Sequence, residues 1–167
     1  AWKEGDYKTI NNVYYKSCLN QVIIGSLLFI GIWGNIHNIF NEYLLPPEFE
    51  PGRYVIFYIS LASLIQLAGG TSNMILFTSK QYRIHTYLML ALVLLLVSSN
   101  FLLIPMMGIV GAAIASAASF LIFNIIKFLY LKLKFGFKPY DHRIFLVILF
   151  ALIVYGINMI LPTLDFF

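Results

Sequence analysis

The chain has 167 residues, of which 60% are hydrophobic and only 11% are charged, and its mean hydropathy is +0.85. Soluble domains carry about 25% charged and about 45–50% apolar residues, so this composition excludes an ordinary soluble domain and indicates an integral membrane protein. The net charge of +4 does not indicate a nucleic-acid partner, because the basic residues stand between long apolar runs, as membrane topology requires. A single cysteine, Cys18, excludes an internal disulfide framework.

The first segment, residues 1–18, is polar and mixed in charge. We expect it to form a cytoplasmic loop or an interfacial helix that leads into a transmembrane region over residues 19–167. Neither an initiator methionine nor the apolar core of a signal peptide stands at its start, so we expect the sequence to be part of a longer chain.

Five apolar segments are long enough to cross a membrane as helices, which takes roughly 20 residues each. They cover about residues 19–45, 54–79, 85–104, 108–131 and 144–161. The second segment is interrupted by Gly69 and Gly70 with polar neighbours, and we expect a kink there. The sequence therefore predicts an all-α integral membrane protein with five transmembrane helices.

The junction between the third and fourth segments carries the most distinctive pattern of the chain. One apolar run ends at Pro105, and a second begins at Gly108. Small residues then recur four apart, which places them on one helix face and lets a neighbouring backbone approach closely in lipid. The sequence therefore predicts two membrane helices joined by a tight turn. The residues of this packing motif are Asn100, Pro105, Gly108, Gly111, Ala112, Ala115 and Ser119.

The distribution of basic residues predicts the orientation. Ten of the 11 lysines and arginines fall on alternate loops between the predicted spans. Alternate loops lie on the same side of the membrane, and the opposite side has only Arg53. The positive-inside rule makes the side with ten basic residues cytoplasmic. We therefore predict a cytoplasmic N-terminus and an external C-terminus for this segment.

Polar residues at membrane depth are costly and often functional, so they supply a candidate substrate pathway. Its members are Asn35, His37 and Asn38 in the first span and Gln66 and Asn73 in the interrupted second span. In the functional interpretation the residues of the first span face a sugar-bearing headgroup, or His37 takes up a coupling proton, and Gln66 and Asn73 line the pathway. In the alternative interpretation, which we favour, they form hydrogen bonds between helices.

Three lysines stand at the end of the fourth span: Lys127, Lys132 and Lys134. We expect their side chains to reach out to the cytoplasmic headgroups. A second interpretation is that they attract a diphosphate-bearing lipid. The sequence contains no HExxH motif, no phosphate-binding glycine loop and no Cys/His cluster. We therefore expect no enzyme activity, no metal and no cofactor.

The stretch Asn100–Ser116, NFLLIPMMGIVGAAIAS, resembles a signature of the polysaccharide and O-antigen flippases, which translocate lipid-linked oligosaccharides and belong to the MOP superfamily. In that signature an Asn, an apolar stretch with Leu-Ile-Pro and a Gly-x-x-Gly-Ala-Ala-x-Ala-Thr run join two late helices, and Ser116 replaces the common Thr. Residues 45–49, LPPEF, and 78–80, TSK, resemble two of the family's connectors.

The resemblance implies a MATE-like transporter of 12 or 14 helices in two lobes, in which the five predicted spans are most like helices nine to thirteen of fourteen. It implies transport of a polyprenyl-diphosphate-linked oligosaccharide across the bacterial inner (cytoplasmic) membrane for surface polysaccharide synthesis, by alternating access and without covalent chemistry. The expected partners are the lipid-linked glycan, membrane lipids and an N-terminal lobe of the same chain. The alternatives are a MATE-like multidrug or cation antiporter and, less favoured, a membrane-embedded enzyme of envelope polysaccharide synthesis.

Overall fold

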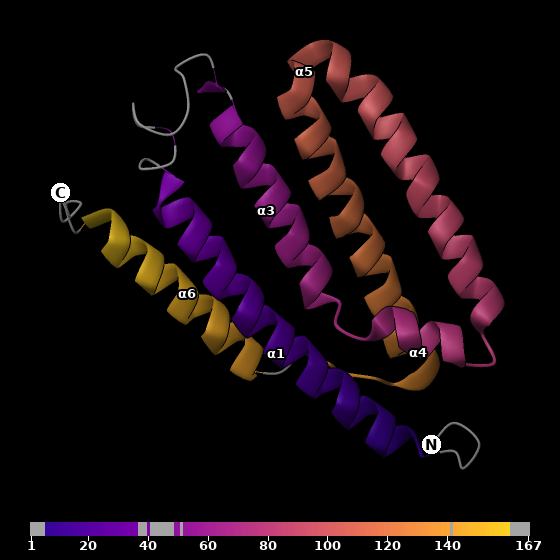
Figure 1. Cartoon of the computed structure of the whole chain (residues 1–167). Helices are drawn as coiled ribbons and strands as arrows, with labels where there is room; N and C mark the ends of the chain where they lie inside the picture. Colours follow the sequence, from indigo (N-terminus) through magenta and orange to yellow (C-terminus); the bar gives the residue numbers. More distant parts are fainter. Residues whose placement is uncertain (1–5, 37–39, 41–48, 51, 141, 161–167) are drawn as a thin grey trace.

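A computed structural model of the chain describes residues 6–36, 40, 49–50, 52–140 and 142–160 (Figure 1). The described part consists of helices and their connections and contains no strand, which confirms the predicted all-helical class. The main helices are α1 (Tyr7–Gly34), α3 (Gly52–Ala68), α4 (Ser72–Thr78), α5 (Tyr82–Phe135) and α6 (His142–Ile160).

Helix α1 begins at Tyr7, where the sequence analysis expected a separate loop or interfacial helix. The Asp6 carboxylate caps the helix by accepting the backbone N–H of Thr9 at 3.0 Å. Hydrogen bonding from the Thr9 side chain, and then from its backbone, lowers the pKa of the carboxyl. Ile10, Tyr14, Cys18 and Val22 recur four apart and are all buried. The polar N-terminal stretch from Tyr7 is thus the first part of one continuous helix, because one of its faces packs against the bundle.

Among the described residues, two helices, α1 and α5, are long and apolar enough to cross a membrane, and the bent pair α3 and α4 makes a third candidate if it is one span. Helix α5 is folded back on itself at Gly108, whose φ of 59° and ψ of −139° are not helical, and its two arms lie side by side (Figure 1). The chain is therefore compatible with a membrane protein. The division into five spans stays a prediction.

The small-residue motif lies between the two arms of α5. The hydroxyl oxygens of Ser99 and Ser119 are 3.0 Å apart, and a Cβ atom added at Gly111 would overlap the carbonyl group of Leu103. Within the motif Gly111, Ala115 and Ser119 are buried, Asn100 and Ala112 are half-buried, and Pro105 and Gly108 are exposed at the turn. The Asn100 amide donates to the Leu96 carbonyl within its own arm at 2.7 Å.

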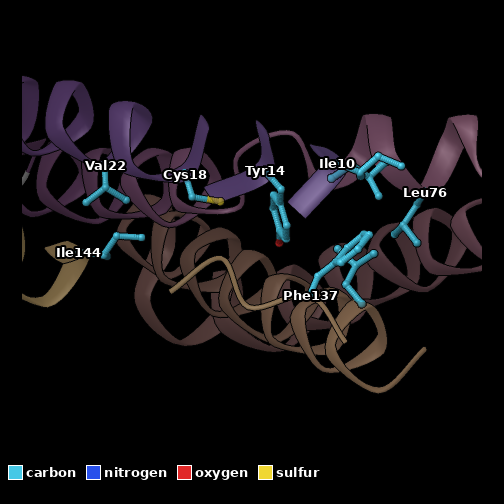
Figure 2. Packing of buried hydrophobic residues seen from close by; sticks show 9 residues of the cluster. Ile10, Tyr14, Cys18, Val22, Leu76, Phe137 and Ile144 are labelled. Carbon is cyan, nitrogen blue, oxygen red and sulfur yellow. The ribbon is translucent and has the colours of Figure 1, made fainter. Parts of the chain in front are cut away.

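The helices form a layer in which α6 lies beside α1, α1 beside α3, and α3 beside the second arm of α5 (Figure 1). The short helix α4 packs against α5 at one end of this layer. The main hydrophobic cluster gathers at the same end, and Figure 2 shows most of its side chains. Its buried members are Ile10, Tyr14, Cys18, Val22, Ile75, Leu76, Leu131, Phe137 and Ile144.

A hydrogen bond between side chains far apart in the sequence joins α1 and α6. The Trp33 indole N–H donates to the Tyr155 hydroxyl at 2.8 Å. Between the same two helices lies an apolar groove of about 490 Å³, whose walls include Leu27, Val147 and Phe150.

Candidate functional site

The second predicted span is broken, as the sequence analysis expected. Helix α3 ends at Ala68, α4 begins at Ser72, and the two are bent by 47°. Gly70 has a φ of +54°, and a Cβ atom there would lie 2.6 Å from the Cys18 sulfur. A Cβ atom at Gly69 would lie 2.5 Å from Asn124 Oδ1. The two glycines therefore let α1 and α5 approach the break from different sides.

Lys127 of α5 is buried beside this break, with only 3% of its surface exposed. Its Nζ donates a hydrogen bond to Asn73 Oδ1 of α4 at 2.9 Å and lies 4.5 Å from the centroid of the Phe123 ring. An aromatic face at this distance attracts a cation. No ion pair of Lys127 with a described carboxylate is present. Within the described chain, an amide and an aromatic ring hold this amine.

The burial of Lys127 corrects the expectation that this side chain reaches the headgroups. Helix α4 packs against α5 and supplies Asn73, which covers and binds the amine. Lys132 and Lys134, in the last turn of α5, are exposed as expected. Of the three lysines, only Lys127 is enclosed by the bundle.

The wall of the site also contains polar atoms without hydrogen-bond partners among the described residues. The Asn124 amide donates from Nδ2 to the Phe120 carbonyl at 2.9 Å, whereas its Oδ1 is buried and unpaired. Thr71 Oγ1, within the break itself, is likewise buried and unpaired. Because buried polar atoms are normally hydrogen-bonded, these two oxygens are suited to contact water or a polar ligand.

The predicted pathway residues divide into two groups. Gln66 and Asn73 lie on either side of the break, and both are exposed. Asn35 follows α1 at the other end of the bundle, where its amide donates to the Gly31 carbonyl at 2.8 Å (Figure 1). His37 and Asn38 lie outside the described residues. The structure therefore does not bring Asn35 together with Gln66 and Asn73.

The sequence analysis missed the role of two residues on α5. It assigned Lys127 to the membrane surface and did not single out Asn124. A usable signal was present, since an Asn and a Lys three residues apart share one face of an otherwise apolar helix. The contact of Lys127 with Asn73 of α4, and the position of Asn124 beside Gly69, become visible only in the folded chain.

The described residues include no group of three His, Cys, Asp or Glu side chains that could hold a metal ion. The arrangement at the break consists of one buried cationic group, two amides, a threonine hydroxyl and two glycines. These groups can bind and orient a polar ligand through charge and hydrogen bonds. Comparison of the chain with protein families, curated proteins and solved structures found no match.

Proposed function

We propose that the chain is part of a membrane transporter, a flippase that carries a polyprenyl-diphosphate-linked oligosaccharide across the bacterial inner membrane for surface polysaccharide synthesis. The observation that carries this proposal is the buried Lys127 beside the broken pair α3 and α4. Ionisable residues inside membrane helices are rare and mark substrate or ion pathways. Discontinuous helices form binding sites in secondary transporters.

The charge pattern supports an anionic cargo. The described helices contain no Asp or Glu between their first and last residues, while Lys127 lies buried among them. A lysine attracts a diphosphate, whereas export of a cationic drug would call for a carboxylate within the membrane. This pattern favours the lipid-linked diphosphate over the cation antiporter.

The resemblance of Asn100–Ser116 to the flippase signature supports the same proposal. The motif lies in a hairpin whose arms approach closely through Gly111 and are joined by Ser99 and Ser119. A rigid hairpin of this kind suits a protein in which groups of helices move as units during alternating access.

The test is complementation in the host after deletion of the full-length gene. We expect the deletion to accumulate the lipid-linked glycan in the cytoplasmic leaflet and to remove the surface polysaccharide, and the wild-type gene to restore both. Lys127→Met should reach the membrane at a normal level without restoring export, whereas Lys134→Met, which neutralises an exposed lysine, should restore it. An unchanged glycan after deletion would refute the proposal, and new sensitivity to cationic drugs would favour the antiporter.

A further inference from the structure

The short helix α4 turns one pair of apolar side chains into the core and a second pair outward. Ile75 and Leu76 belong to the main hydrophobic cluster, whereas Met74 and Phe77 are 64% and 65% exposed. Met74 and Phe77 stand three residues apart and therefore share one face of the helix. A rotation that buried this face would expose Ile75 and Leu76, so the folded chain presents Met74 and Phe77 to its surroundings.

The position of α4 along the span places this face at a membrane boundary. Two charged residues, Glu50 and Arg53, stand at the start of α3, so this end of the helix lies near one boundary. The 17 residues of α3 extend for about 25 Å, which is most of a hydrocarbon core of about 30 Å. The 7 residues of α4, bent by 47° from α3, advance only about 7 Å further in the same direction. Helix α4 therefore crosses the level at which hydrocarbon gives way to headgroups.

Basic residues surround α4 at this end of the bundle (Figure 1). The two ends of α5 meet here, since the Tyr130 hydroxyl donates to Gln81 Oε1 at 3.2 Å. Four exposed basic residues lie in the connection after α4 and at the two ends of α5: Lys80, Arg83, Lys132 and Lys134. Among the described residues, Asp6 is the only carboxylate at this end. Such a surface attracts anionic lipid headgroups.

We propose that α4 is an interfacial helix that binds the anionic phospholipid surface of its leaflet. Met74 and Phe77 enter the boundary between headgroups and acyl chains, and Lys80 and Arg83 bind lipid phosphates. The partner is the phospholipid bilayer itself, and the inference is independent of the cargo that the transporter carries. Because α4 forms one side of the break, the bilayer surface also holds that side in place.

The test of the depth of α4 is fluorescence quenching by brominated phospholipids in vesicles that contain the full-length protein. A bimane label is attached to Phe77→Cys, or to Met74→Cys as a second reporter, after replacement of all native cysteines by Ala. Val97→Cys is the matched control, because Val97 is 63% exposed and lies about 21 Å from Arg83 along α5. We expect bromines near the ester end of the acyl chains to quench the α4 labels most strongly. Bromines near the methyl end should quench the control most strongly.

The contribution of the basic residues is measured by the preference for anionic lipid. Quenching by brominated phosphatidylglycerol and by brominated phosphatidylcholine gives the ratio of their association constants at Phe77→Cys. A lysine or arginine near a membrane surface changes this ratio by about fivefold, so Lys80→Gln and Arg83→Gln should each lower it by about fivefold. High salt should lower it as well, because exposed charges are screened. Arg53→Gln, at the opposite end of α3, is the control and should leave the ratio unchanged.

Three results would overturn the inference. If the label on Phe77→Cys were quenched at the same depth as the label on Val97→Cys, α4 would lie in hydrocarbon. If the control were quenched and neither α4 label were, protein would cover this face. If the lipid preference were unchanged in the double variant of Lys80→Gln and Arg83→Gln, these bases would not bind headgroups. All of these measurements are made without any glycan, so their outcome is separate from that of the complementation test.

Discussion

Gly70→Ala tests the geometry of the break. Gly70 has a φ of +54°, a conformation that costs a non-glycine residue about 1–2 kcal/mol. The added Cβ would also lie 2.6 Å from Cys18 Sγ, 3.0 Å from Cys18 N and 3.2 Å from Cys18 Cα. Overpacking of this kind costs about 1–3 kcal/mol, so we expect a total loss of about 2–5 kcal/mol in the free energy of unfolding.

Thermal unfolding of the purified protein in detergent, followed by tryptophan fluorescence, measures this loss. At about 2–4 °C per kcal/mol, Gly70→Ala should lower the Tm by about 4–20 °C. Gly136→Ala is the matched control, because Gly136 also has a positive φ, of 69°, but no atom lies within 4 Å of its added Cβ. That variant should lose only the conformational part, about 1–2 kcal/mol.

A double variant separates the two contributions. Cys18→Ala removes the sulfur from the contact with Gly70→Ala but leaves the backbone of residue 18 in place, so it should recover only part of the steric loss. The reasoning would be refuted if Gly70→Ala were no less stable than Gly136→Ala. It would also be refuted if Cys18→Ala destabilised the Gly70→Ala protein as much as it destabilises the wild type.

Three further predictions test contacts elsewhere in the bundle. Asn73→Ala removes the acceptor of the buried Lys127 and should lower the free energy of unfolding by about 1.5–3 kcal/mol, with a smaller effect in a Lys127→Met background. Ser99→Ala and Ser119→Ala, combined in a double-mutant cycle, should show a coupling of about 0.6 kcal/mol across the hairpin, and additive effects would contradict the hydrogen bond. Asp6→Ala should lower the Tm at pH 7, since it removes the cap of α1. Because the folded pKa of Asp6 is lowered, its contribution is present above the unfolded pKa of about 3.9 and is lost as pH falls through the folded value, so the two proteins should differ less at pH 2 than at pH 7.

Features determined by neighbouring residues could be predicted from the sequence. The turn of the α5 hairpin lies at Gly108, within the predicted junction, because a glycine after a proline-terminated apolar run provides the backbone freedom for reversal. The break at Gly69 and Gly70 was expected for the same local reason, and the 47° bend confirms it. In both places the residue that permits the geometry is the one that signals it.

Features determined by distant parts of the chain could not be predicted. A lysine eight residues before the end of an apolar helix can either reach the headgroups or be enclosed by other helices. Lys127 is enclosed because α4 places Asn73 over it. The early start of α1 likewise depends on the burial of Ile10 and Tyr14 in the cluster shown in Figure 2. The periodicity of the sequence does not reveal either contact, because each one joins residues of different helices.

The hydrogen bond between Trp33 and Tyr155 has a consequence for synthesis on the ribosome. Its partners are 122 residues apart, which corresponds to about 6–24 s of translation at 5–20 residues per second. The serine pair of the α5 hairpin is separated by only 20 residues and can form about 1–4 s after its first member is made. A ribosome that stalls before α6 would thus leave a finished hairpin and an α1 that can pack against α3 but still lacks α6, which leaves the α6-facing side of α1 open to membrane chaperones and proteases.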